Sequence, residues 1–448
     1  MPERASLERT WLTSMVGEPP KPRSKTRKVS TWPRWSHCVV ALLLSPTSCA
    51  TAPERVRAPA AAEACIRVED LPMQVVGGDQ RIVHLGDGPG WAGRRVTLCP
   101  RDRPLRRMRF KVRQSGVSLD CGGNELSGEG ETDADRMPWA LDVDRSLVPA
   151  PSDVTITNCT FRGYRRGLVF AGPDITDFDP QKRLRRFRVH DVRILDAAGE
   201  AIYIGAHTRD VTLERVEVRN ATLTAVYLDA YSRGTVIRDS VFVHNGWSRC
   251  SLGREAIAID ASTNNLIVGN HFEDNRFAAI ALYKNCGESD TPRNQPADHN
   301  RIEGNSFRGH CSESGAAVIL ASRQGVDLST NDCLSDVCLD PPVWGARRRD
   351  HARFNTVAFN RFEGNRYDAR ILDGYNRFVG NWLGERGCEA GEGPRVLVGS
   401  ELLAAIGEPI EGVSVARNRS LTEGWLRIDQ APPESGEPSP TRAASTGR

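Results

Sequence analysis

Lysine, aromatic residues and long hydrophobic runs are all scarce in this 448-residue sequence. Lysine occurs at six positions, so arginine supplies almost all of the 60 basic side chains, and aromatic residues make up 6% of the chain. The apolar run at residues 39–44 is far shorter than the roughly 20 residues of a membrane-spanning helix, which argues against a transmembrane anchor. The net charge of +3 comes from the first 38 residues. The rest of the chain is close to neutral, which disfavours binding to nucleic acid through bulk charge.

The first 52 residues have the order of an export signal. Basic residues 21–37 run directly into Cys38 and the apolar run. Two processing sites stay open: residues 46–49 resemble a lipoprotein box ending at Cys49, and residues 50–52 offer an A-x-A cleavage site. We therefore predict an extracytoplasmic protein, in the periplasm, on the cell surface or secreted, in which membrane attachment would depend on a lipidated Cys49.

Ten cysteines remain beyond this leader, and they form no paired CxxC motif. An even number of cysteines without zinc spacing is typical of disulfides made in an oxidising compartment, which agrees with export. The excess of arginine over lysine is typical of a GC-rich bacterial source.

A short β-type phrase recurs along the chain, in which one apolar residue is followed by another five positions later. The spacing of the phrases gives a unit of about 21 to 24 residues with insertions. The pairs are Ile156/Phe161, Val189/Ile194, Leu213/Val218, Ile237/Phe242, Ile267/Phe272, Ile302/Phe307, Leu328/Cys333, Val357/Phe362 and Phe378/Leu383. The third position after the first member is asparagine in the last five units, namely Asn270, Asn305, Asn331, Asn360 and Asn381. Asparagine at one point of every coil predicts a hydrogen-bonded ladder at a corner.

A second apolar phrase precedes each of these, for example Ala201-Ile202-Tyr203-Ile204 and Ala225-Val226-Tyr227-Leu228. Two or three short strands per unit, without a 3.6-residue period, predict an all-β parallel solenoid. A β-propeller needs longer repeats, and a leucine-rich repeat would show its own consensus.

Residues 154–161, 265–272 and 116–128 (VTITNCTF, NLIVGNHF and GVSLDCGGNELSG) resemble right-handed parallel β-helix repeats of the pectin-lyase-like superfamily. The resemblance covers about residues 115–385 and implies a right-handed parallel β-helix. It implies little about function, because that superfamily includes lyases, hydrolases, epimerases and adhesins.

The remaining segments are assigned around this solenoid. We expect a leader at 1–52, a linker at 53–64, an N-terminal cap at 65–114 that holds Cys65 and Cys99 as a disulfide, the β-helix at 115–385, a C-terminal cap at 386–430 and a disordered tail at 431–448.

Strand alternation places one strip of polar and aromatic side chains on the outside of the predicted solenoid. Rings and charged groups on an exposed strip are typical of a polysaccharide groove, and a solvated sheet face is the alternative. The candidate catalytic residues are Lys284, Tyr283, Asp260 and Asp229, and the candidate substrate-binding residues are Tyr203, His207, Tyr227, Tyr231, Arg233, Arg254 and Arg323.

Three functions compete for this strip. Hydrolysis would use Asp229 and Asp260 on neighbouring coils, although the motifs of β-helix polygalacturonases are absent. β-Elimination or epimerisation of a uronate would use Lys284 as the base, which is the role that the resemblance to β-helix lyases implies. The third function is a non-catalytic scaffold or glycan-binding protein. The expected partner is a polysaccharide, acidic or neutral, and the oligomeric state stays open.

Loops that leave the coils near the strip locate its working face. Residues 243–254 and 286–300 carry one cysteine each, which predicts a Cys250–Cys286 disulfide. Basic runs at 183–188 and 347–351 are assigned to solvated surface. Cofactors are undetermined: Asp174, Asp177 and Asp179 are spaced for a calcium loop but lack a complete ligand set.

Overall fold

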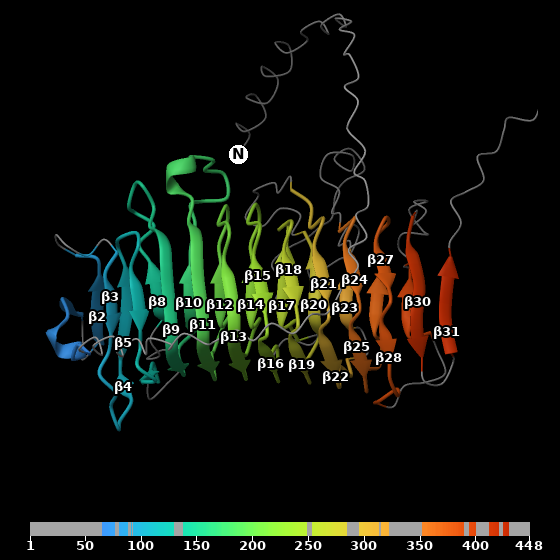
Figure 1. The fold of residues 1–448 in the computed structure, drawn as a ribbon, viewed down its shortest axis with the longest axis horizontal. Coiled ribbons are helices and arrows are strands. Elements are labelled where there is room, and N and C mark those ends of the chain that lie inside the picture. The colour runs from blue at the N-terminus through green and yellow to red at the C-terminus, as the bar shows by residue number, and fades with distance from the viewer. Residues whose placement is uncertain are drawn as a thin grey trace, which may run out of the picture. The chain divides into compact units, whose positions relative to one another are not determined.

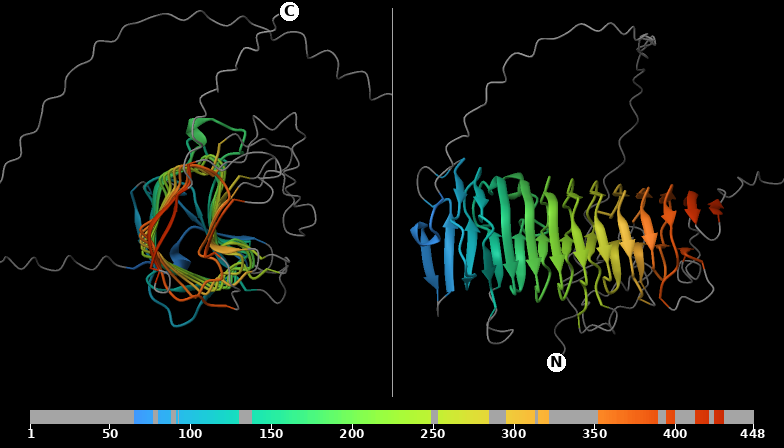
Figure 2. Two further views of the ribbon diagram at one scale, coloured as in Figure 1. Left: turned by 90° about the vertical axis from the view of Figure 1, so that its right-hand side faces the viewer. Right: turned by 60° about the horizontal axis from the view of Figure 1, so that its bottom comes forward.

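The chain folds into a parallel β-solenoid in a computed structural model that describes residues 65–76, 80–87, 91, 93–129, 138–248, 253–284, 295–312, 315–321, 352–388, 394–399, 412–420 and 424–429. Each coil contributes strands to three sheets that run along the solenoid, and the coils superpose when viewed down its axis (Figure 2). Within the described ranges, no helix is long and apolar enough to cross a membrane.

Within the described residues, sheet 1 has twelve strands (Figure 1). The first strand pairs antiparallel with the second, and all further pairings in the sheet are parallel. Its strands, in order, are β1 (Met73–Val76), β2 (Gln80–Leu85), β5 (Met108–Val112), β8 (Trp139–Val143), β10 (Arg166–Phe170), β12 (Ile202–Ile204), β14 (Val226–Leu228), β17 (Ile257–Asp260), β20 (Ala278–Tyr283), β23 (Ala316–Leu320), β26 (Ala369–Ile371) and β29 (Val396–Val398).

Sheets 2 and 3 are joined by long strands that bend from one into the other. Sheet 2 contains β3 (Arg95–Thr97), β6 (Ser118–Asp120), β15 (Val236–Arg238), β18 (Leu266–Val268), β21 (Arg301–Glu303), β24 (Thr356–Ala358) and β27 (Arg377–Val379). Sheet 3 contains β4 (Leu105–Arg106), β7 (Glu125–Ser127), β16 (Val241–Val243), β19 (His271–Glu273), β22 (Ser306–Arg308), β25 (Arg361–Glu363) and β28 (Trp382–Leu383). Both sheets share β9 (Ser152–Arg162), β11 (Arg185–Leu195), β13 (Thr212–Arg219) and β30 (Ser414–Ser420), and β31 (Gly424–Asp429) pairs antiparallel with β30. Two short 3-10 helices, η1 (Val68–Asp70) and η3 (Pro180–Lys182), lie outside the sheets.

The apolar pairs predicted from the sequence point into the solenoid. Ile237, Ile267 and Ile302 are in register on successive coils, and so are their partners five residues later. Four of the partner rings form a continuous stack, with centroids 4.9–5.1 Å apart. The stacked residues are Phe242, Phe272, Phe307 and Phe362, all of which are fully buried. The right-handed parallel β-helix is therefore confirmed, with its core between the three sheets.

Asparagine ladders close the corners where strand pairing stops. A residue in the left-handed conformation, such as Gly304 (φ 64°), turns the chain, and the next side chain points inward. The Asn360 Oδ1 accepts hydrogen bonds from the backbone N and the Nδ2 of Asn305 (2.9 and 3.0 Å), and the Asn360 Nδ2 donates to the Ile302 carbonyl (2.9 Å). This pattern satisfies buried backbone groups that no strand reaches.

The predicted ladder is one of three. Between sheets 2 and 3 it runs through Asn270, Asn305, Asn360, Asn381 and Asn418. Between sheets 1 and 2 a second ladder runs through Asn265, Asn300, Asn355 and Asn376. Between sheets 3 and 1 a third runs through Asn245, Asn275, His310 and Asn365.

One predicted unit is wrong. β21 pairs directly with β24, and Asn305 bonds directly to Asn360, so no coil separates them. The phrase Leu328/Cys333 and Asn331 lie outside the described residues. The phrase matched because an apolar residue five positions from another also occurs by chance within insertions.

Parallel pairing extends beyond both predicted limits of the β-helix. β2 pairs in parallel with β5, and β3 with β6, so part of the segment assigned to the N-terminal cap already forms coils. β29 and β30 continue the sheets beyond residue 385. The antiparallel strands β1 and β31 occupy the two ends, where they pair with an edge that would otherwise be open.

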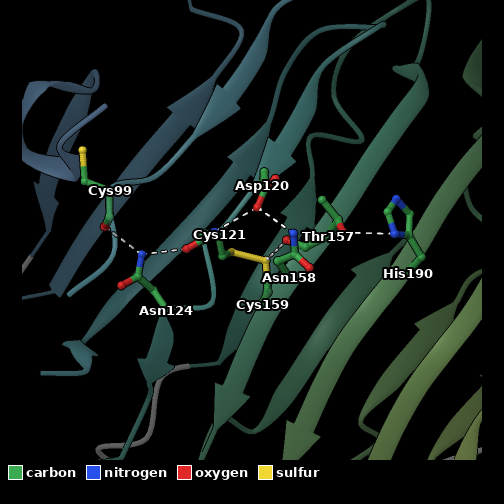
Figure 3. Close-up of a disulfide and its surroundings, with 9 residues drawn as sticks. Cys99, Asp120, Cys121, Asn124, Thr157, Asn158, Cys159 and His190 are labelled. Atoms are coloured by element: carbon green, nitrogen blue, oxygen red, sulfur yellow. Dashed lines mark hydrogen bonds between the residues drawn. A yellow bond between two sulfur atoms is a disulfide. The ribbon is translucent and has the colours of Figure 1, made fainter. Parts of the chain in front are cut away.

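Disulfides join neighbouring parts of the solenoid. Cys65–Cys99 and Cys121–Cys159 have Cα–Cα distances of 4.8 and 4.9 Å, close to the spacing of adjacent strands. Figure 3 shows the second bond beside Asp120, whose carboxylate accepts from the Asn158 Nδ2 (3.1 Å). A third disulfide links Cys311 to Cys388. The predicted Cys250–Cys286 pair lies outside the described residues.

His310 replaces asparagine in the third ladder and makes it sensitive to acid. Its Nδ1 lies 3.0 Å from the Asn365 Oδ1 and must donate to it, while its Nε2 lies 3.4 Å from the Asn275 Nδ2 and must accept. Neutral histidine satisfies both contacts, whereas a protonated ring would present a second donor to the Asn275 amide. Burial accordingly lowers the pKa of His310 to about 4, although the nearby Asp274 and Glu273 oppose this shift.

We predict that His310→Asn removes the loss of folding stability that protonation of His310 causes at acidic pH. The stabilisation from neutral His310 is complete above the unfolded-state pKa of about 6.5 and is lost as pH falls toward 4, by about 2–3 kcal/mol in total. Urea unfolding of both proteins at pH 7.5 and pH 4.5 measures the difference in the free energy of unfolding. The free energy of unfolding of the variant minus that of the wild type should be larger at pH 4.5 than at pH 7.5 by this amount. The same difference at both pH values would contradict the assignment.

Candidate functional site

The predicted strip lies on the outer face of sheet 1. Tyr203 of β12 is in register with Tyr227 of β14, followed by Ala258 of β17 and Ala281 of β20. The two tyrosine rings are half-buried and stacked, with centroids 5.8 Å apart. Strand alternation therefore placed these side chains on the correct face.

The expectation that the whole strip is exposed is wrong. Asp260, Tyr283 and Lys284 are 0%, 2% and 2% exposed. The outward alanines form a second apolar cluster with Tyr283 and Ile319, separate from the main core. Alternation decides on which side of a strand a residue lies, but it does not decide whether that side is covered. Lys284 is thus a buried residue and neither a surface lysine nor an accessible base.

Tyrosine hydroxyls and carboxylates pair from coil to coil along this face. The Tyr203 hydroxyl donates to Asp229 Oδ2 on the next coil, and the Tyr227 hydroxyl donates to Asp260 Oδ2 in the same way. Asp229 Oδ1 also accepts from the Ala230 N–H (2.7 Å). Both predicted carboxylates are consequently held in fixed orientations by the repeat.

Arg254 belongs to a buried ionic cluster. Its guanidinium lies 3.1 Å from Glu255 Oε1, and the Tyr283 hydroxyl donates to the same oxygen (2.7 Å). Burial is the largest influence and acts to lower the pKa of Arg254, but Glu255, Tyr283 and Tyr227 together outweigh it and raise the pKa above its usual range. Arg254 is therefore neutralised within the fold.

The predicted residues His207 and Tyr231 meet at the edge of sheet 1. Their rings stack with centroids 4.9 Å apart, and Phe178 packs edge-on against both. The His207 Nε2 donates to the Ile175 carbonyl (2.9 Å), which fixes its tautomer. Burial lowers the pKa of His207, so the ring is neutral near pH 7. These contacts anchor the excursion at residues 171–184, which projects between β10 and β11 in Figure 1.

A cavity of about 730 Å³ lies beneath this excursion. Its floor is formed by Tyr203, Gly205 and Asp229 of the strip, and its walls come from two loops. The wall residues are Arg145, Ser146, Val148, Ala171, Gly172, Pro173, Asp174, Ile175, Asp177, Lys182 and Ala206. The Lys182 ammonium pairs with Asp177 (2.6 Å), which lowers the pKa of that carboxyl.

The structure divides the predicted site into three groups. Tyr203 and Asp229 line the cavity, and His207 and Tyr231 anchor the excursion that covers it. Arg254, Tyr283, Lys284 and Asp260 are enclosed beside Tyr227, and Arg233 is exposed at the corner after sheet 1. Arg323 lies outside the described residues.

Sequence reasoning missed the walls of the cavity. The spacing of 33 residues between Ile156 and Val189 signals an insertion in this coil, but it does not show that the inserted residues fold back over Tyr203. Asp174, Asp177 and Asp179 lie in this insertion, and no group of three potential metal ligands occurs among the described residues.

Comparison with known proteins agrees with this architecture. Residues 147–333 match the family model described as right handed beta helix region. The chain therefore has the right-handed parallel β-helix fold that its resemblance to the pectin-lyase-like superfamily implies. No curated protein matches the chain.

Several solved structures are similar to the chain at low sequence identity. An alginate lyase from Paenibacillus sp. str. FPU-7 is 11% identical over 68% of this chain and 83% of its own, with a TM-score of 0.34. The catalytic domain of a GH87 alpha-1,3-glucanase in complex with nigerose is 10% identical over 75% of this chain and 63% of its own, with a TM-score of 0.47. The surface protein and adhesin PfbA of Streptococcus pneumoniae is 12% identical over 71% and 79%, with a TM-score of 0.35. The similarity concerns the fold alone.

We predict that Glu255→Gln destabilises the protein by about 3 kcal/mol, because it leaves the charge of Arg254 buried without its carboxylate. Glu217→Gln provides the matched control, since Glu217 pairs with the exposed Arg193 (2.8 Å) and should cost less than about 1 kcal/mol. Denaturant unfolding of the two variants measures both values. Equal losses would show that Arg254 is not held by Glu255.

Proposed function

We propose that this protein is an exported glycan-binding protein that holds an oligosaccharide in the cavity beneath residues 171–184. The observation that carries the proposal is the cavity itself, whose floor places the Tyr203 ring beside the Asp229 carboxylate. Its volume of about 730 Å³ falls in the range of small-molecule sites. The Tyr203 ring is contacted by Tyr227 (5.8 Å between centroids) and by the Arg166 guanidinium (5.2 Å), so it supports the cavity floor. The Asp229 carboxylate, like any carboxylate, has about four acceptor positions and can receive hydrogen bonds from sugar hydroxyl groups.

Export is part of the same proposal. Three disulfides within the described residues support folding in an oxidising compartment, in agreement with the leader sequence. Attachment through a lipidated Cys49 stays a prediction of the sequence.

Binding is favoured over β-elimination by the position of Lys284. A general base must come within hydrogen-bonding reach of the proton that it removes. Lys284 is 2% exposed and lies outside the cavity lining, so the geometry supports a glycan-binding role more strongly than a lyase or epimerase that uses this lysine.

We expect Asp229→Asn and Tyr203→Phe to weaken glycan binding at least about tenfold, because the first replaces a charged acceptor oxygen by an NH2 donor and the second removes the hydroxyl from the cavity floor. Affinity electrophoresis of the full chain through alginate, pectate, chondroitin, heparin and a neutral glucan measures retardation. Asp239→Asn serves as the control, since Asp239 is exposed at a distant corner in a conformation that asparagine adopts readily. Retardation that both cavity variants retain would rule out this site.

The same glycans test for catalysis. We expect no rise in ultraviolet absorbance from unsaturated uronate when they are incubated with the wild-type protein. A rise that Lys284→Ala abolishes, in a variant that keeps its melting temperature, would instead establish a lyase with Lys284 as the base.

A further inference from the structure

Three arginines stand on successive coils at the corner that follows sheet 1. Backbone bridges join Arg185 to Arg209 and Arg209 to Arg233, and the next coil continues with Thr263. We call Arg185, Arg209 and Arg233 the arginine ladder. Their neighbours Leu184, Thr208 and Ser232 are buried, so alternation directs the arginines outward. The three backbones span about 10 Å along the solenoid axis.

Like charges on adjacent rungs repel one another, and several arginines on the other faces of this solenoid are paired with carboxylates. Arg193 pairs with Glu217 on the next coil (2.8 Å), and Arg215 pairs with Asp191 on the previous one (2.7 Å). Within the described part of the chain, Arg209 and Arg233 have no carboxylate partner within 4 Å. The ladder therefore carries an unneutralised charge that costs stability.

A fourth arginine increases this charge. Arg183 donates to the Phe178 carbonyl (2.7 Å), and the Nε atoms of Arg183 and Arg209 are buried without a hydrogen-bond partner. Burial and the charges of Arg233 and Arg183 lower the pKa of Arg209, while Asp210 opposes this shift. Asp210 cannot balance four guanidinium groups.

Asp153 is another carboxylate at this corner. It forms an ion pair with Arg186, and the charge of Arg185 also acts on it. Its negative charge is thus already engaged, and the corner keeps an excess of positive charge.

The ladder adjoins the proposed glycan cavity. Lys182 lines the cavity and Arg183 follows it in the chain, while Arg209 lies two residues beyond His207, which anchors the cavity wall.

We propose that the arginine ladder, with Arg183, binds carboxylate or sulfate groups of an acidic glycan whose neighbouring sugar rings occupy the cavity. Guanidinium groups bind both anions through paired N–H donors. Of the described carboxylates near this corner, Asp153 pairs with Arg186 and Asp177 pairs with Lys182, which leaves Asp210 and Asp179 against four arginines. The inference rests on the proposed function and specifies the class of ligand. A nucleic acid is disfavoured because the ladder is short and the rest of the chain is close to neutral.

Three hexasaccharides test the proposal by isothermal titration calorimetry with the full chain. A heparin hexasaccharide carries sulfate and carboxylate groups, a pectate hexasaccharide carries carboxylates alone, and maltohexaose is neutral. We expect at least one acidic probe to bind more tightly than maltohexaose, and the double variant Arg209→Gln/Arg233→Gln to lose at least about tenfold of that affinity. Comparison of the two acidic probes shows which anion is preferred.

Arg193→Gln is the matched control, because this exposed arginine is paired with Glu217 on another face. It should leave binding unchanged. The melting temperature without ligand supplies an independent readout: removing mutual repulsion should hold or raise it in the double variant, whereas arginines with a structural role would lower it on removal.

The outcomes separate the two proposals. Acidic binding that the double variant loses and Asp229→Asn retains upholds the ladder and rejects the cavity. Maltohexaose binding as tight as acidic binding, with no effect of the double variant, rejects the ladder and leaves the cavity in place. Failure of both acidic probes to bind rejects the ladder, and the polysaccharide panel still decides the cavity.

Discussion

Hydrogen bonding along the solenoid axis is the constraint on which the other features depend. Parallel strands hold each coil to the next, and asparagine side chains carry the same bonding through the corners, as Asn305 and Asn360 do between sheets 2 and 3. Buried backbone groups at a corner would otherwise lack partners, at a cost of roughly 1–3 kcal/mol each. Because the asparagine side chains supply these partners, the chain can turn sharply at the three corners between the sheets.

This bonding fixes the register, and the register decides which side chains meet. Residues at one position of successive coils become neighbours about 4.8 Å apart, whatever their separation in the sequence. Thus Phe242 stacks on Phe272 in the core, Tyr203 stacks on Tyr227 outside it, and each tyrosine reaches the carboxylate of the following coil. The same rule brings like charges together in the arginine ladder.

The sequence was sufficient to predict the fold because the core repeats and the corner asparagines share one period. It was less informative about the outer face. Alternation placed Tyr203 and Tyr283 outside the core, but Tyr283 is buried in a second apolar cluster with small residues such as Ala258 and Ala281, which carry no periodic signal of their own. The cavity walls come from an insertion, and an insertion has no repeat from which its path could be inferred.

Charge balance separates structural polar groups from candidate binding groups on this solenoid. Arg254 is buried and forms an ion pair with Glu255, and the buried Arg395 forms an ion pair with Asp368 (2.6 Å). Removing either carboxylate would leave a buried charge without a partner and would destabilise the fold. Arg209 and Arg233 show the opposite arrangement, in which the described part of the fold supplies backbone register but no counter-charge. On another face, Arg193 and Arg215 are paired with carboxylates of adjacent coils. An external anion would supply the missing counter-charge at the arginine corner, and the adjoining cavity is where the rest of such a ligand would fit.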